Sequence, residues 1–213
     1  MITLDRRHFL GASFAFAGLL ASPSRLTVPR ESSLPSGIPD VAPPTSGPPI
    51  LRQAFAALDR HADRIIHRDR LGVVDFSVHS GEPRFHIVDI GERKVLHSLL
   101  VAHGRGSDPA NSGYATRFSN RPGSNASSSG SYVTGDAYVG KHGRSRRLHG
   151  LEEGNDLAFE RAIVIHGANY VDRSMAEVQG RVGRSLGCFA FEQSEIGTVL
   201  ELLGAGRLLY AAA

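Results

Sequence analysis

Eight of the eleven prolines in this 213-residue chain fall between residues 22 and 49, among serine, glycine and threonine. A segment of this composition buries too little apolar surface to fold, and its prolines make it an extended tether. We therefore predict a disordered linker over residues 22–49. Residues 50–213 remain, which is enough for one domain with its own core and too little for two.

Residues 1–21 have the pattern of an export signal. Arg6 and Arg7 precede Phe-Leu, and an uncharged run from Gly11 to Ala21 follows. At about 11 residues this run is too short to span a bilayer as a mature helix. A basic start, a short apolar middle and small residues are typical of a secretory signal, and paired arginines favour the twin-arginine type. We expect export and no membrane span after signal removal; an uncleaved N-terminal anchor is the alternative.

The remaining sequence predicts a mostly β fold, either a sandwich or a barrel, because short β-branched and apolar runs alternate with turn signals. Apolar residues at helical spacing predict an amphipathic helix over residues 50–69. A C-terminal helix is expected over residues 194–203, capped by Ser194 and stopped by Gly204. The expected strands cover residues 73–79, 84–90, 94–101, 132–140, 146–152 and 161–167, and residues 189–191 after the cysteine alternate like a further strand.

Residues 102–131 are dominated by glycine, serine and asparagine. Such a long loop inside a compact domain is uncommon, and we expect a functional lid, with disorder as the alternative. The 24 Lys+Arg residues barely exceed the 21 Asp+Glu residues. This small excess is ordinary for a solvated surface, and no basic run with interleaved aromatic residues indicates nucleic acid.

Cys188 is the single cysteine of the chain, so an internal disulfide is excluded. It can be a buried small hydrophobe, half of an intermolecular bridge, or a nucleophile. As a nucleophile it needs a base, and His166 follows a buried apolar run at residues 162–165. Arg181 and Arg184 can add positive charge. Gly187 can let a substrate carbonyl approach, and backbone N–H groups near the cysteine can stabilise an oxyanion.

The stretch HGANYVDRSMAEVQGRVGRSLGCFA, residues 166–190, resembles the signature of the YkuD-type L,D-transpeptidase catalytic domain. It is most similar to the murein L,D-transpeptidase catalytic domain family, with IHGA-x-YV followed by GR-x-GRS-x-GC. VAHGRGS, YVGKHG and RLHGLE occur upstream in the same order. The resemblance covers about residues 74–192, most of the expected domain.

The resemblance implies a β-rich fold and cysteine acyl transfer on peptidoglycan stem peptides, in the periplasm or cell envelope of a bacterium. Cys188 would attack the bond between a diamino acid and terminal D-alanine, and an amine would resolve the acyl-enzyme. His166 would be the general base, oriented by the Gly167 carbonyl. Neither step needs a metal or an organic cofactor.

Three positions depart from the family pattern. Leu186 replaces a histidine of the broader family, so we expect no second histidine to help shape the pocket. Phe189 replaces a proline and Ala190 an arginine, so recognition of stem carboxylates falls to Arg184 or Arg181. The candidate substrate-binding residues are Tyr138, Lys141, His142, Arg184, Ser185 and Gly187.

Rival functions stay open at this point. Water in place of the amine acceptor would give an L,D-carboxypeptidase, and a non-catalytic wall-binding module is a second alternative. A metallopeptidase would draw on His166 with two of His103, His142 and His149, but neither HExxH nor CxxC occurs. The oligomeric state is not readable from the sequence.

Overall fold

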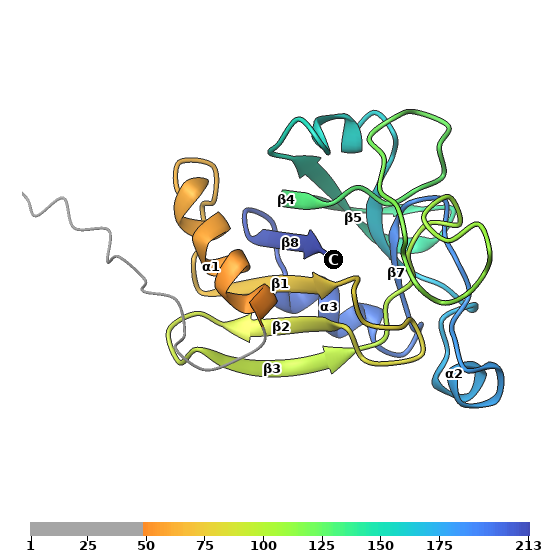
Figure 1. Ribbon diagram of the computed structural model, residues 1–213. Coiled ribbons are helices and arrows are strands. Elements are labelled where there is room, and N and C mark those ends of the chain that lie inside the picture. Colours follow the sequence, from red (N-terminus) through yellow and green to blue (C-terminus); the bar gives the residue numbers. More distant parts are fainter. Residues whose placement is uncertain (1–48) are drawn as a thin grey trace, which may run out of the picture. The chain divides into compact units, whose positions relative to one another are not determined.

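The computed structural model describes residues 49–213 (Figure 1). The predicted signal at residues 1–21 and nearly all of the predicted linker lie outside the described residues, and both stay predictions. The elements in chain order are α1 (Pro49–Arg60), β1 (Arg70–Asp75), β2 (Phe85–Asp89), β3 (Lys94–Leu99), β4 (Gly130–Gly140), β5 (Gly143–Gly150), a 3-10 turn (Asp156–Ala158), β6 (Val164–Gly167), α2 (Arg173–Gln179), β7 (Phe189–Phe191), α3 (Ile196–Leu202) and β8 (Leu208–Ala212).

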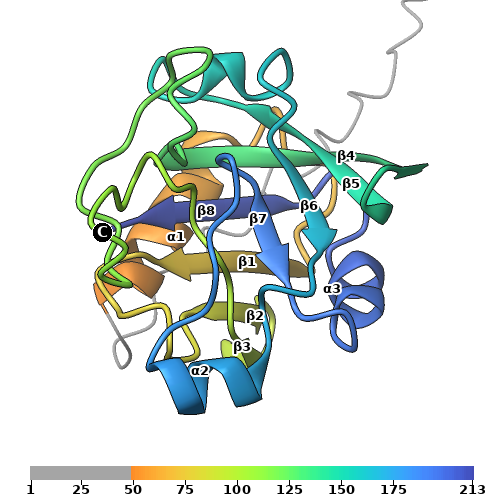
Figure 2. The same ribbon diagram turned by 90° about the vertical axis from the view of Figure 1, so that its right-hand side faces the viewer.

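All eight strands form one sheet in the order β3-β2-β1-β8-β4-β5-β6-β7. Neighbours are antiparallel except for the pairs β1–β8 and β6–β7, which are parallel. The last strand in sequence, β8, therefore lies inside the sheet and joins its two halves. In Figure 2, β5, β6 and β7 run across the direction of β4, β8 and β1.

The sheet curls around a shared core. Phe85 of β2 and Phe191 of β7 are far apart in the strand order, yet their rings meet edge to face with centroids 4.6 Å apart. Such a contact requires the two ends of the sheet to approach each other, which confirms the mostly β, barrel-like expectation. The main core includes Val74, Phe76, Phe85, Ile87, Tyr132, Leu148, Ile165, Phe189, Phe191, Leu209 and Ala211.

Helix α1 covers the other face of β1, where it packs against Leu71 and Val73. The prediction of a helix over residues 50–69 is right about its start and wrong about its end at residue 69. The chain turns after Arg60, and the backbone N–H of Ile65 donates to the carbonyl of His61. Ile65 still enters the same cluster, because a turn brings it there without a helix.

Helix α3 confirms the C-terminal helix, but Ser194 does not cap it. The N-cap is Glu195, and its side chain makes no capping hydrogen bond. Besides the 3-10 turn, one α-helix and one strand were not expected from the sequence. One is α2, capped by the Asp172 carboxylate, which accepts from the Met175 N–H; the other is β8.

Candidate active site

Cys188 lies at the end of a tight turn that leads into β7. The turn is closed by Ser185, whose hydroxyl accepts from the Gly187 N–H at 3.1 Å and donates to the Cys188 carbonyl at 2.7 Å. Ser185 is buried, so its hydroxyl holds the turn instead of facing solvent. The Gly187 N–H, which we expected to be available for an oxyanion, is already used.

Gly187 is required by the backbone and by its neighbours. Its φ of +121° is a conformation that residues with a side chain rarely adopt. A Cβ there would lie 2.8 Å from the Ala126 carbonyl oxygen and 2.7 Å from a methyl of Ile163. The missing side chain makes room for residues 126 and 163, and the approach of a substrate carbonyl to this glycine stays a prediction.

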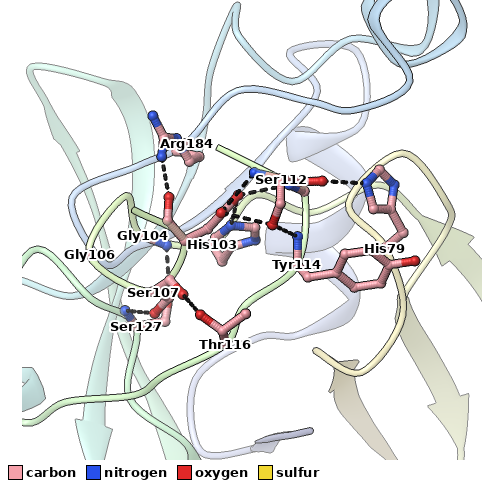
Figure 3. Close-up of polar contacts among 12 residues, drawn as sticks. His79, His103, Gly104, Gly106, Ser107, Ser112, Tyr114, Thr116, Ser127 and Arg184 are labelled. Carbon is pink, nitrogen blue, oxygen red and sulfur yellow. Dashed lines mark hydrogen bonds and ion pairs between the residues drawn. The ribbon is translucent and has the colours of Figure 1, made fainter. Parts of the chain in front are cut away.

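The loop over residues 102–131 supports the turn. Figure 3 shows Arg184, which precedes the turn, in contact with this loop, and Ser127 hydrogen-bonded to Ser107 and Gly104 within the loop. The Ser185 N–H donates to the His103 carbonyl at 2.9 Å, and the Ser127 hydroxyl donates to the Gly187 carbonyl at 3.1 Å. Although residues 102–131 are all described, none of them lines the cavity at Cys188. The expectation of a lid is wrong, since this loop holds the turn and does not cover the cavity.

Two ionisable side chains of this loop, His103 and Asp108, are fully buried, and so is Arg84 from just before β2. A guanidinium Nη2 of Arg84 donates to His103 Nδ1 at 2.6 Å, and His103 Nε2 lies 3.4 Å from Asp108 Oδ2. Burial, helped by the charge of Arg84, lowers the pKa of His103 to about 4. Burial also opposes ionisation of Asp108, but N–H donors from Ser112 and Gly113 outweigh it and lower its pKa. His103 is thus a neutral acceptor for Arg84 at neutral pH.

His166 is buried in β6, next to β7, which follows Cys188. Its Nδ1 lies 2.8 Å from the Gly167 carbonyl oxygen, so Nδ1 carries the proton and Nε2 keeps a free electron pair. The ring of His142 stacks on it with centroids 4.1 Å apart. Burial lowers the pKa of His166; the Gly167 carbonyl opposes this shift, while His142 and Lys141 add to it. The imidazole is therefore neutral at neutral pH.

Cys188 and His166 line the same cavity, of about 390 Å³. The lining is Tyr138, Lys141, His142, Arg161, Ala162, Val164, His166, Tyr170, Arg184, Ser185, Leu186 and Cys188. Six substrate-binding residues were predicted besides Cys188 and His166. Five of them line the cavity, namely Tyr138, Lys141, His142, Arg184 and Ser185, whereas Gly187 does not. Gly167 lines an adjoining cavity of about 500 Å³ that shares Lys141, His142 and Tyr170 with the first.

The structure adds two residues that the sequence analysis missed, Arg161 and Tyr170, and corrects one statement. His142 comes from the β4–β5 turn, so a second histidine does shape the pocket although position 186 is leucine. Arg181 is not among the lining residues, and its Nη1 donates to the Gln179 carbonyl. Proximity of Tyr170 to the cysteine was not visible in sequence.

The thiol of Cys188 is half-buried and donates to the Ala162 carbonyl at 3.4 Å. Burial raises the pKa of this thiol. The backbone of Val164 opposes that rise most, and the positive charges of Lys141 and Arg161 oppose it further. The resting group is thus a thiol that points to a backbone carbonyl. Ala162 itself has a φ of +53°, which is uncommon for a residue other than glycine.

Within residues 49–213, no three or more His, Cys, Asp or Glu side chains gather in a way that could hold a metal ion. His149 instead stacks on Phe159. The helices of the same residues are all too short or too polar to cross a bilayer.

A family model described as the L,D-transpeptidase catalytic domain matches residues 44–212, which is most of the chain. The chain belongs to this family. The match confirms the resemblance found in the sequence, and it includes every residue that lines the cavity at Cys188. No curated protein matches the chain.

Solved L,D-transpeptidases are similar to this chain at low sequence identity. An L,D-transpeptidase from Mycobacterium smegmatis is 14% identical, with a TM-score of 0.41 over 68% of this chain and 59% of that one. L,D-transpeptidase 3 from Mycobacterium tuberculosis, solved with a faropenem-derived adduct, is 12% identical, with a TM-score of 0.42 over 68% and 60%. One from Xylanimonas cellulosilytica is 14% identical, with a TM-score of 0.40 over 78% and 70%. The chain thus spans about three fifths of the length of the first of these.

Proposed function

We propose that this protein is an L,D-transpeptidase that acts on peptidoglycan stem peptides through a Cys188 acyl-enzyme. The observation that carries the proposal is the cavity shared by the thiol of Cys188 and a neutral His166 with a free Nε2. Membership of the L,D-transpeptidase family supports the same reaction class. A nucleophile beside an oriented base is the arrangement that covalent acyl transfer needs.

His166 is the general base of the proposed reaction. Its Nδ1–H is held by the Gly167 carbonyl, so only Nε2 is free to accept the thiol proton. The thiol now donates to the Ala162 carbonyl, and its S–H must turn from that carbonyl to the imidazole before the proton can be transferred. The lowered pKa of His166 keeps the ring unprotonated, as a base requires.

The chemical steps then balance as two acyl transfers. The Cys188 thiolate adds to the carbonyl carbon of the diamino acid, and the C–N bond to terminal D-alanine breaks. Protonated His166 returns its proton to the leaving amine, so D-alanine departs and a thioester remains. An acceptor amine then attacks the thioester and gives its proton to His166. The C–S bond breaks as the new amide forms, and His166 returns the proton to the departing Cys188 thiolate.

The charges of the site suit an anionic substrate. Lys141, Arg161 and Arg184 line the cavity, whereas no aspartate or glutamate among the described residues does. Stem peptides carry free carboxylates, which Lys141 and Arg184 can neutralise. The adjoining cavity shares Lys141 and His142, so donor and acceptor stems can be held on the two sides of this pair.

We also propose that residues 1–21 direct twin-arginine export to the bacterial cell envelope, where this substrate occurs. The proposal rests on Arg6 and Arg7 before the uncharged run. Replacing both arginines by lysine should leave the protein in the cytoplasm after cell fractionation. Arg30→Lys, a matched change outside the signal, should not; export of the double variant at the normal level would refute the route.

The activity is tested with purified protein, a disaccharide-tetrapeptide and excess D-methionine, read by mass spectrometry. Exchange of D-alanine for D-methionine, absent from Cys188→Ala, would support transpeptidation. Release of a tripeptide would indicate an L,D-carboxypeptidase that uses water. An unchanged tetrapeptide with folded protein would contradict the proposal and favour a wall-binding module.

A further inference from the structure

Arg161 is a half-buried cation without a carboxylate partner. No ion pair within residues 49–213 includes it, although three other arginines in this range pair with acids. Burial of a charge is costly unless the charge is balanced or well solvated. The positive charge of this guanidinium therefore needs a compensating group.

Neutral groups of one loop hold the guanidinium in place. Nη1 of Arg161 donates to the Ser119 carbonyl and the Ser128 hydroxyl, both at 2.6 Å. Nη2 donates to the Ala126 carbonyl at 2.5 Å and the Ser124 hydroxyl at 3.3 Å. These four contacts replace water and fix the position of the group. None of them cancels its charge, so a permanent positive charge stays at this place.

This charge lies on the wall of the cavity that contains the thiol. Arg161 is a lining residue, and the next residue, Ala162, offers the carbonyl to which Cys188 Sγ donates at 3.4 Å. The positive φ of Ala162 turns the backbone between the two contacts. One short segment before β6 thus places both the cation and the resting partner of the thiol.

The other charged or titratable groups that face Cys188 do not supply a fixed anion. They come from the β4–β5 hairpin, β6, the segment before α2 and the cysteine turn, and they are Tyr138, Lys141, His142, His166, Tyr170 and Arg184. Burial, with a contribution from Cys188, raises the pKa of Tyr170 to about 12, so this phenol is neutral. His142 and His166 are neutral because burial lowers their pKa values. The anion that can form in this cavity is the thiolate.

We propose that Arg161 is a positioning residue that supplies a fixed positive charge and stabilises the thiolate of Cys188. The inference deepens the proposed function, because it rests on Cys188 being the nucleophile. Lys141 adds a second charge from a hairpin turn, whereas Arg161 is locked by four hydrogen bonds and needs no rearrangement when the thiolate forms.

The test is the rate of carbamidomethylation by iodoacetamide as a function of pH in the full-length protein. The reagent is uncharged, and Cys188 is the only cysteine, so the rate reports on this thiolate alone. Arg161→Gln should move the midpoint of the rate profile up by about one pH unit, a tenfold lower thiolate fraction below the midpoint. Arg161→Lys keeps the charge but not the four hydrogen bonds, and its midpoint should stay near that of the wild type.

Arg117→Gln is the matched control. Arg117 lies on the loop over residues 102–131, whose groups hold Arg161. Its Nε donates to the Gly106 carbonyl at 2.8 Å, but it does not line the cavity at Cys188. Its midpoint should be unchanged. Equal upward shifts in Arg161→Gln and Arg161→Lys would mean that the residue only scaffolds the loop, which overturns the inference.

An unchanged midpoint in Arg161→Gln would also overturn it. If that variant instead showed a higher KM for the tetrapeptide, Arg161 would be a substrate-carboxylate ligand. Failure of the proposed function is a separate result, because D-methionine exchange would then be missing in wild-type protein while the alkylation profiles still differed among the variants.

Discussion

The buried His103 predicts a specific loss of stability in mild acid. Its pKa is about 6.5 when unfolded and about 4 in the fold, where burial and Arg84 disfavour the imidazolium. As pH falls, the unfolded chain takes up this proton before the folded protein does. The stabilising contribution is therefore complete above about pH 6.5 and is lost as pH falls towards about 4.

The size of this loss follows from the two pKa values. Linkage gives a loss of about 2 kcal/mol between about pH 7.5 and about pH 5, and about 3 kcal/mol by about pH 4. Other groups also titrate in this range, so the wild-type protein alone does not isolate His103. His103→Gln keeps an acceptor for Arg84 and removes the titration, and the difference between the two proteins isolates the contribution of this one side chain.

Urea unfolding of both proteins at about pH 7.5 and about pH 5 measures the difference. We expect the wild type to lose about 2 kcal/mol more than His103→Gln over this interval. Equal losses would refute the reasoning, because they would mean that His103 is protonated as easily in the fold as in the unfolded chain.

Three further changes test the packing of the fold. Gly187→Ala should abolish D-methionine exchange and lower the melting temperature more than Gly143→Ala does, because both glycines have positive φ but only the first would clash. Phe85→Ala should cost about 3–5 kcal/mol in urea unfolding, whereas Val139→Ala, 79% exposed, should be nearly neutral. Ser127→Ala should cost about 1–3 kcal/mol, because the hydroxyl serves a buried carbonyl and a buried N–H. If that last variant kept full stability and full activity, the loop would not support the cysteine turn.

The positions of Cys188 and His166 were predictable because local sequence encodes them. An apolar run before the histidine and a Ser-Leu-Gly before the cysteine place each residue beside a strand, and the family pattern joins the two. The geometry of the neighbouring turns was harder to predict from the sequence. We expected residues 161–167 to form a strand, but the strand begins at Val164, because Ala162 has positive φ and turns the chain.

Buried polar groups were the largest failure of sequence reasoning. His103 stands in a run rich in glycine and serine, which is typical of a surface loop, yet it is fully buried. Its environment depends on Arg84 from just before β2 and on Asp108, and neither contact leaves a periodic signal. Arg161 was missed for the same reason, since its partners lie about 33 to 42 residues earlier in the chain.

Strand β8 was missed because both of its faces are covered. Leu208 packs towards α1 while Leu209 packs into the main core, so the run has no polar alternation to mark it as a strand. Strand β1 also lacks polar alternation at its start, because residues 71–74 are all buried. We therefore expected it to begin at residue 73, whereas it begins at Arg70.

The place of β8 has a consequence for how this domain acquires its structure. Strand β8 pairs with β1 on one side, where Leu71 lies opposite Leu208, and with β4 on the other. Among the ladders of the described residues, those of β8 connect β1, β2 and β3 to β4, β5, β6 and β7. Contacts between such distant parts of a chain close late and slow folding. A fragment that lacks residues 208–212 would leave β1 and β4 each with an unpaired edge, and such edges are prone to aggregation. The two parts of the sheet would then meet through core contacts and the bridge between Ala102 and Ala190. Cooperative assembly of the complete sheet therefore depends on the final strand.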